Sequence, residues 1–65
     1  MKLNKTKLFI AMANKGITTT ELAKAANMSI STISHGFTRS VLPTTAGRLS
    51  KVLDVPVGQI IVRED

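Results

Sequence analysis

The strongest constraint in this sequence is a pair of helix-start signals that lie close together. Thr18, followed three residues later by Glu21, forms a capping box, in which each side chain accepts a hydrogen bond from a backbone amide that has no partner inside the helix. Ile17 and Leu22 occupy the flanking positions of a hydrophobic staple. Ser29 supplies a second N-cap eleven residues after Thr18. Two helices therefore begin within a short span, with room for only a tight turn between them.

The turn between these two helices centres on Asn27, a residue type that tolerates a positive φ at modest cost. Met28 precedes the second N-cap and has the spacing to pack on Ile33 as a second staple. Leu22, Met28 and Ile33 then supply the apolar contacts between the helices, and Ala23 is small enough to let their backbones approach. Two short helices joined in this way must cross steeply.

The segment before the capping box predicts a first helix that begins at about Asn4, as N-cap, and runs to Asn14. Spacing at i, i+3 and i+4 places apolar residues on one buried stripe. That stripe comprises Leu8, Ala11 and Met12. Gly16 can adopt the left-handed conformation that ends a helix and turns the chain.

The second half of the chain predicts two further helices. Pro43 suits a first helical position and begins the fourth helix. Gly47 in its middle costs about 1 kcal/mol relative to alanine, so we expect close packing at that residue. The fifth helix is short and runs from Pro56 to Ile61. The buried side of the fourth helix is expected to contain Ala46, Leu49, Val52 and Leu53. No segment alternates as a half-buried strand does, so the predicted class is an all-α, compact bundle of about five short helices.

Length and composition limit the function classes. A chain of 65 residues predicts one domain over residues 1–65, which buries only roughly 60% of its unfolded surface and leaves little room for a catalytic cleft. We therefore expect no enzyme. There is no cysteine, and one histidine with four carboxylates is a poor basis for a metal or acid/base site, so no cofactor is expected. The longest apolar run, Leu8 to Ala13, is too short for a secretory signal or for the roughly 20 residues of a membrane span. A soluble, cytoplasmic domain without a membrane partner is the expectation.

The charge distribution favours a polyanionic partner. The chain has a formal net charge of +5 and a pI of about 10.3. Residues 1–62 hold eight basic and two acidic side chains, an excess of six positive charges. Nucleic acid and an anionic membrane surface are the two candidates, beside the simple alternative of a soluble basic domain. The membrane is disfavoured because the basic residues are spread over several short helices instead of one long amphipathic face.

Taken in order, these features resemble a Cro/C1-type (XRE-like) helix-turn-helix DNA-binding domain over nearly the whole chain. The resemblance rests on Gly16-Ile17-Thr18, Glu21-Leu22-Ala23, Ser29 with Ser31-Thr32-Ile33-Ser34, and the run from Pro43 to Val55. It implies a lambda repressor-like bundle and a transcriptional regulator that binds operator DNA, often as a dimer. The sequence thus predicts a small phage- or bacterial-type repressor whose third helix enters the major groove of double-stranded DNA.

The resemblance also assigns contacts to residues. Base contacts fall on the outer side of the third helix, at Ile30, Ser31, Thr32 and His35. Phosphate contacts fall at the starts of the second and third helices and in the loop that follows, at Thr19, Ser29, Thr38, Arg39 and Ser40. Apart from the resemblance, Thr20 at the start of the second helix offers a backbone amide and a hydroxyl to a neighbouring phosphate. Helix N-termini favour phosphate because their amides are free and their dipole end is positive. The family's usual glutamine at the start of the second helix is Thr19 here, which has a shorter reach.

Two departures from the family pattern affect the helix ends. Gly36 occupies a position where a bulky apolar residue is usual, so we expect the third helix to stop early and Phe37 to take the vacated core space. Leu42 occupies the N-cap position of the fourth helix and has no capping oxygen. That start is then uncapped by a side chain unless Thr44 or Thr45 assists.

Two residues of the third helix leave alternatives open. Ile30 either touches a thymine methyl group or is a partly buried core residue. His35 either contacts DNA or lies idle on the surface.

Several apolar residues exceed what so small a core needs, and exposed apolar clusters suggest a partner surface. They are Phe9, Ile10, Ile60, Ile61 and Val62. The hypothesis is a homodimer through the fifth helix and the C-terminal segment, and the alternative is that all five pack inside the domain. The alternative function is a protein-interaction module on the same fold, such as an antitoxin-like or anti-repressor partner, which a salt titration of DNA binding would distinguish.

Overall fold

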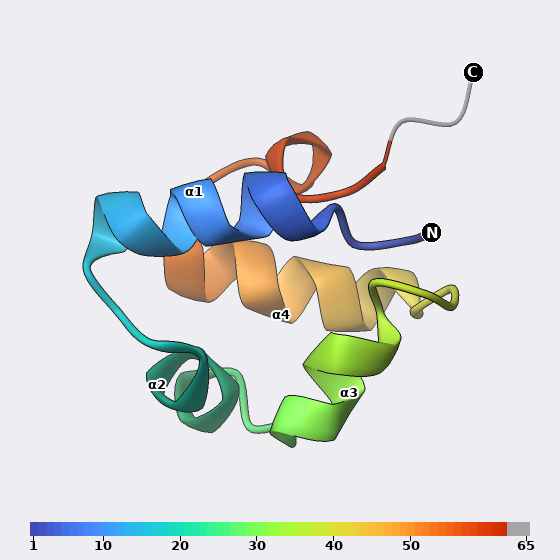
Figure 1. Cartoon of the computed structure of the whole chain (residues 1–65), viewed down its shortest axis with the longest axis horizontal. Coiled ribbons are helices and arrows are strands. Elements are labelled where there is room, and N and C mark those ends of the chain that lie inside the picture. Colours follow the sequence, from blue (N-terminus) through green and yellow to red (C-terminus); the bar gives the residue numbers. More distant parts are fainter. Residues whose placement is uncertain (63–65) are drawn as a thin grey trace.

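The computed structural model describes residues 1–62 and is built from short helices joined by tight turns (Figure 1). Its elements are α1 (Lys5–Lys15), α2 (Thr19–Ala25), α3 (Ile30–His35), α4 (Pro43–Leu53) and the 3-10 turn η1 (Val57–Gln59). α1 and α4 lie side by side, α2 and α3 lie beyond α4, and η1 packs on α1 and α4. The all-α class is confirmed. No helix within residues 1–62 has the length and apolarity needed to cross a membrane.

Side chains cap the starts of α1 and α2 at the residues that the sequence predicts. Thr18 Oγ1 accepts from the Glu21 amide at 3.2 Å, and Glu21 Oε1 accepts from the Thr18 amide at 3.0 Å, which completes the capping box. Asn4 Oδ1 accepts from the Lys7 amide at 2.9 Å and caps α1. Leu42 precedes α4 with no side-chain cap, so that start depends on Pro43 and on packing.

One apolar core is shared by all the helices. Its buried members are Leu3, Leu8, Ala11, Met12, Leu22, Ala23, Ala26, Ile33, Ala46, Leu49, Leu53 and Ile60. The predicted stripe of α1 is confirmed. On α4, Val52 is only partly buried, although it packs against the core. Ser50, which the sequence does not predict on the buried side, is buried, and its hydroxyl donates to the Gly47 carbonyl at 2.9 Å. The predicted close packing at Gly47 is wrong, because a Cβ at this residue would have no heavy atom of a neighbour within 4 Å.

The predicted fifth helix, Pro56 to Ile61, is wrong. The chain makes only the three-residue turn η1 and then pairs its backbone with the N-terminal segment, through an isolated antiparallel bridge between Leu3 and Ile61. A segment this short gains few helical hydrogen bonds for the cost of nucleation, and pairing with a second segment satisfies its amides instead. As a result Ile60 is fully buried.

The end of α3 confirms one expectation and corrects another. α3 ends at His35, and Gly36 is its C-cap. The sequence predicts that Phe37 fills the space beside Gly36, and this prediction is wrong. The Leu3 side chain fills that space. Phe37 is half-buried at the edge of the core, where its ring meets Phe9 edge to face at 6.2 Å between centroids.

Replacing Thr18 with alanine should lower the free energy of unfolding by about 1 kcal/mol, because the Glu21 amide loses its acceptor at the start of α2. Urea denaturation followed by circular dichroism measures the change. The matched control is Thr20→Ala, which removes an exposed threonine side chain in the same helix and should have little effect. Equal stability of Thr18→Ala and the wild type would contradict the capping role.

Candidate nucleic-acid interface

The turn between α2 and α3 sets the direction in which α3 leaves the domain. Asn27 has φ +57°, the left-handed conformation that the sequence predicts. The Asn27 amide donates to the Lys24 carbonyl at 3.1 Å, and the Met28 amide donates to the Ala23 carbonyl at 2.9 Å. These bonds satisfy the end of α2 while the chain reverses. The two helices consequently run in clearly different directions (Figure 1).

α3 is attached to the domain by one side only. Ile33 is 1% exposed and packs into the core, while Ser31 and His35 are exposed on the outer side. Ile30 is 46% exposed, so it is not a core residue. Thr32 is half-buried and lies against its own N-cap. The outer side of α3 therefore presents a hydroxyl, an imidazole and one apolar side chain to the surroundings.

Two of the residues predicted to contact DNA, Ser29 and Thr32, are hydrogen-bonded to each other at the start of α3. Ser29 Oγ accepts from the Thr32 amide at 3.1 Å and shares a hydrogen bond with Thr32 Oγ1 at 2.9 Å. Both hydroxyls already have a protein partner, so each has less capacity left for an external group. Ser31 and His35 are free of this arrangement, which makes them the stronger candidates for contacts to bases.

The predicted phosphate-contacting residues border α3 on two sides. Thr19 and Thr20 begin α2, the first half-buried and the second exposed. Thr38, Arg39 and Ser40 are all exposed in the loop that follows α3. Backbone amides of this loop donate to the His35 carbonyl, from Thr38 at 3.2 Å and from Arg39 at 2.8 Å.

A hollow of about 550 Å³ connects these groups, because Thr19, Ile30 and Thr38 all line it. Lys5 and Phe9 of α1 line the same hollow, and the Lys5 ammonium lies 5.8 Å from the centroid of the Phe9 ring. The sequence prediction assigns Phe9 to a dimer surface and assigns no contact to Lys5, so neither residue is predicted to lie beside α3. Their i, i+4 spacing on a helix was the available signal, since it places them on one face.

The stretch of sequence that contains α3 is basic. No acidic residue occurs between Leu22 and Leu53, a stretch that contains Lys24, Arg39, Arg48 and Lys51. The nearest preceding carboxylate, Glu21, is engaged in the capping box. Within residues 1–62, no group of three or more His, Cys, Asp or Glu could hold a metal ion. The site is suited to an anionic ligand.

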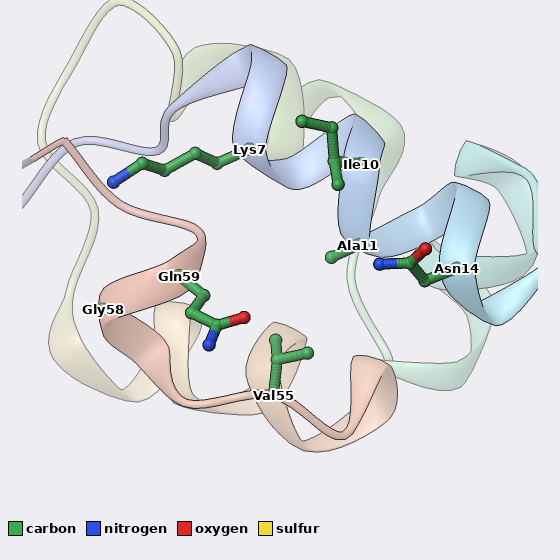
Figure 2. A pocket seen from close by; sticks show the side chains of 7 residues that line it. All are labelled: Lys7, Ile10, Ala11, Asn14, Val55, Gly58 and Gln59. Carbon is green, nitrogen blue, oxygen red and sulfur yellow. The ribbon is translucent and has the colours of Figure 1, made fainter.

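The residues predicted for a dimer surface do not form one cluster. Ile60 is fully buried and offers no surface, while Ile61 and Val62 are half-buried. Phe9 and Ile10 are 44% and 57% exposed but line different hollows. Figure 2 shows the hollow of about 270 Å³ beside Ile10, between α1 and the segment after α4.

The helix-turn-helix class of protein is defined by two short helices joined by a tight turn, with one side of the second helix exposed to solvent. Here the turn contains Asn27 in the left-handed conformation, and the exposed side of the second helix is largely polar. A family model described as the Cro/C1-type HTH DNA-binding domain matches residues 7–65. The chain belongs to this family, as the sequence resemblance predicts. Searches among curated proteins and among solved structures each found no match.

The positive φ of Asn27 predicts how substitutions at this residue change the stability of the domain. Asn27→Ala should lower the free energy of unfolding by about 1 kcal/mol, because alanine tolerates positive φ poorly, whereas Asn27→Gly should be close to neutral. Guanidinium denaturation measures both. The control is Asn14→Ala, the same chemical change within α1, where alanine is well tolerated. If Asn27→Ala proves as stable as Asn27→Gly, the turn does not have this conformation.

Proposed function

We propose that this chain is a sequence-specific DNA-binding transcriptional regulator, a small phage- or bacterial-type repressor that acts by occupying its operator. It carries out no chemistry of its own, and residues 1–65 work as one domain in the cytoplasm, where bacterial and phage DNA lies. The observation that supports this proposal most strongly is the exposed outer side of α3 within a stretch free of acidic residues. A major groove about 12 Å wide accepts such a helix.

The base contacts are assigned to the outer side of α3. Ser31 and His35 can donate and accept hydrogen bonds at base edges, and both are exposed. Ile30 has an apolar side chain suited to a thymine methyl group. Thr32, whose hydroxyl is shared with Ser29, contributes less to base discrimination than the other three residues.

The phosphate contacts are assigned to the two segments that border α3. Thr19 and Thr20 offer hydroxyls and free amides at the start of α2. Ser29 lies at the start of α3 and contributes less through its hydroxyl, which is already bonded to Thr32. Thr38, Arg39 and Ser40 offer one guanidinium and two hydroxyls from the loop. Arg39 carries a full charge, so it should account for much of the salt-dependent affinity of this loop.

The central test is a salt titration of binding to duplexes selected from a random pool. The logarithm of the affinity should fall with the logarithm of the salt concentration, with a slope of about −0.9 for each phosphate contacted. Enrichment of no sequence, or an affinity insensitive to salt, would contradict the proposal and favour a protein-interaction module on the same fold.

Substitutions should separate the two kinds of contact. Arg39→Ala should weaken binding to all sequences and make the salt slope shallower by about 1, whereas Ser31→Ala and His35→Ala should change which base is preferred at one position of each half-site. Selection from random duplexes and fluorescence anisotropy measure these effects. Lys51→Ala is the control for Arg39→Ala, since it removes one exposed charge from the far end of α4.

Ser34→Ala is the control for Ser31→Ala, because it truncates an exposed serine of the same helix that is not assigned to a base. Unchanged base preferences in both Ser31→Ala and His35→Ala would show that the base contacts are assigned to the wrong residues.

We also propose that the regulator binds as a homodimer, which would place two copies of α3 roughly 34 Å apart on one face of the DNA. The support is that Phe9 and Ile10 are exposed and that Ile61 and Val62 are partly exposed, although the four residues do not form one cluster. Ile10 is the best single probe, because it is the most exposed of these four and borders the hollow in Figure 2.

Ile10→Glu should shift the wild-type dimer toward monomer in sedimentation equilibrium, since a carboxylate in place of an apolar side chain is costly to remove from water at the interface. Ala25→Glu introduces the same charge at an exposed residue of α2 and is the control. A wild-type monomer at all concentrations, together with a selected site that lacks two-fold symmetry, would contradict dimerisation.

A further inference from the structure

The N-terminal segment, residues 1–4, is hydrogen-bonded to both ends of the loop that follows α3. The Leu3 amide donates to the Gly36 carbonyl at 2.7 Å, where the loop begins. The Val41 amide donates to the Met1 carbonyl at 2.6 Å, where the loop ends. These two bonds bracket residues 37–40, which include the three loop residues assigned to phosphate contacts.

The opposite edge of the same segment is bonded to the C-terminal part of the described chain. The Asn4 amide donates to the Ile60 carbonyl at 2.8 Å, and the Val62 amide donates to the Lys2 carbonyl at 2.9 Å. The segment therefore lies between two others, as Figure 1 shows near the N-terminus. It cannot shift toward or away from the loop without breaking backbone bonds on one side.

A steric fit between Leu3 and Gly36 adds to these bonds. Gly36 has φ −64°, a helical value that any residue adopts, so its backbone conformation does not require glycine. Space does require it: a Cβ at Gly36 would lie 2.5 Å from Leu3 Cδ1, 2.9 Å from Leu3 Cγ and 3.0 Å from Val41 Cγ1. Leu3 is 1% exposed and has little freedom to move away. Its side chain occupies the volume that a larger residue at position 36 would need.

We propose that Leu3 and Gly36 are positioning residues for DNA binding, a matched pair that sets where the loop after α3 meets the phosphate backbone. This inference rests on the proposed function. Within the loop itself, the backbone bonds of Thr38 and Arg39 run only to His35, three and four residues back. The loop is attached to the domain by the two bonds and the fit at residues 1–4, by the Met1 ammonium, which donates to Ser40 Oγ at 3.5 Å, and by Phe37, which packs on Phe9. The placement of the exposed Thr38, Arg39 and Ser40 depends on these contacts.

The test is the salt slope of DNA affinity in variants of this pair. Gly36→Ala should displace Leu3 or the loop and make the slope shallower by about 0.9 for each phosphate that the loop no longer reaches. Leu3→Ala should do the same by removing the support. The double variant Gly36→Ala/Leu3→Ala should recover part of the wild-type slope, because the new methyl group enters the volume that Leu3 vacates. The effects of the two changes should thus be strongly non-additive.

The control is Leu53→Ala, a truncation of a buried leucine at the C-terminal end of α4, whereas the loop joins the N-terminal end of that helix. It should lower the melting temperature and leave the slope of the folded protein unchanged. Circular dichroism confirms folding of each variant, and Leu3→Val replaces Leu3→Ala should the latter not fold.

Three outcomes would overturn the inference: wild-type slopes in the folded single variants, no recovery in the double variant, or an equally shallow slope in Leu53→Ala. Absence of salt-dependent binding by the wild type would instead overturn the proposed function.

Discussion

The structure depends on side-chain capping of helices that are too short to form alone. α3 has six residues, and in isolation the cost of nucleating such a helix exceeds the gain from its few hydrogen bonds. Ser29 satisfies an amide at its start, and burial of Ile33 attaches one side of it to the core. The capping box of α2 does the same for the helix against which α3 packs. Because capping and one buried side chain suffice, the remaining sides of α3 are free to contact a ligand.

Features that depend on neighbours in sequence could be predicted from the sequence. The capping box, the left-handed Gly16 and Asn27, and the buried stripe of α1 each follow from bonds or spacings within about four residues. The exposure of Ser31 and His35 follows from the same periodicity, since Ile33 must face the core.

Features that depend on distant segments could not be predicted in this way. The segment after α4 has residues that are compatible with a helix, yet Ile61 in it forms a backbone bridge to Leu3. No residue near Ile61 in the sequence indicates that Leu3 is its partner. The sequence shows that position 36 has no side chain, and it favours the adjacent Phe37 as the residue that fills the space. The residue that does fill it is Leu3, which is thirty-three residues away in the sequence. Ile60 is buried for the same reason, because its burial follows from pairing with the N-terminal segment.

The chemistry of α3 connects these distant contacts to the proposed function. Its outer side carries the short hydroxyl side chain of Ser31, which reaches a base edge only if the helix backbone lies deep in the groove. A helix with long side chains tolerates errors of depth, and a helix with short ones does not. In the complex we propose, the depth of α3 is set by the segments assigned to phosphate contacts on either side of it, the start of α2 and the loop after α3. In the complex we propose, discrimination between bases therefore depends on the backbone bonds between residues 1–4 and that loop, although none of those four residues is assigned a contact with DNA.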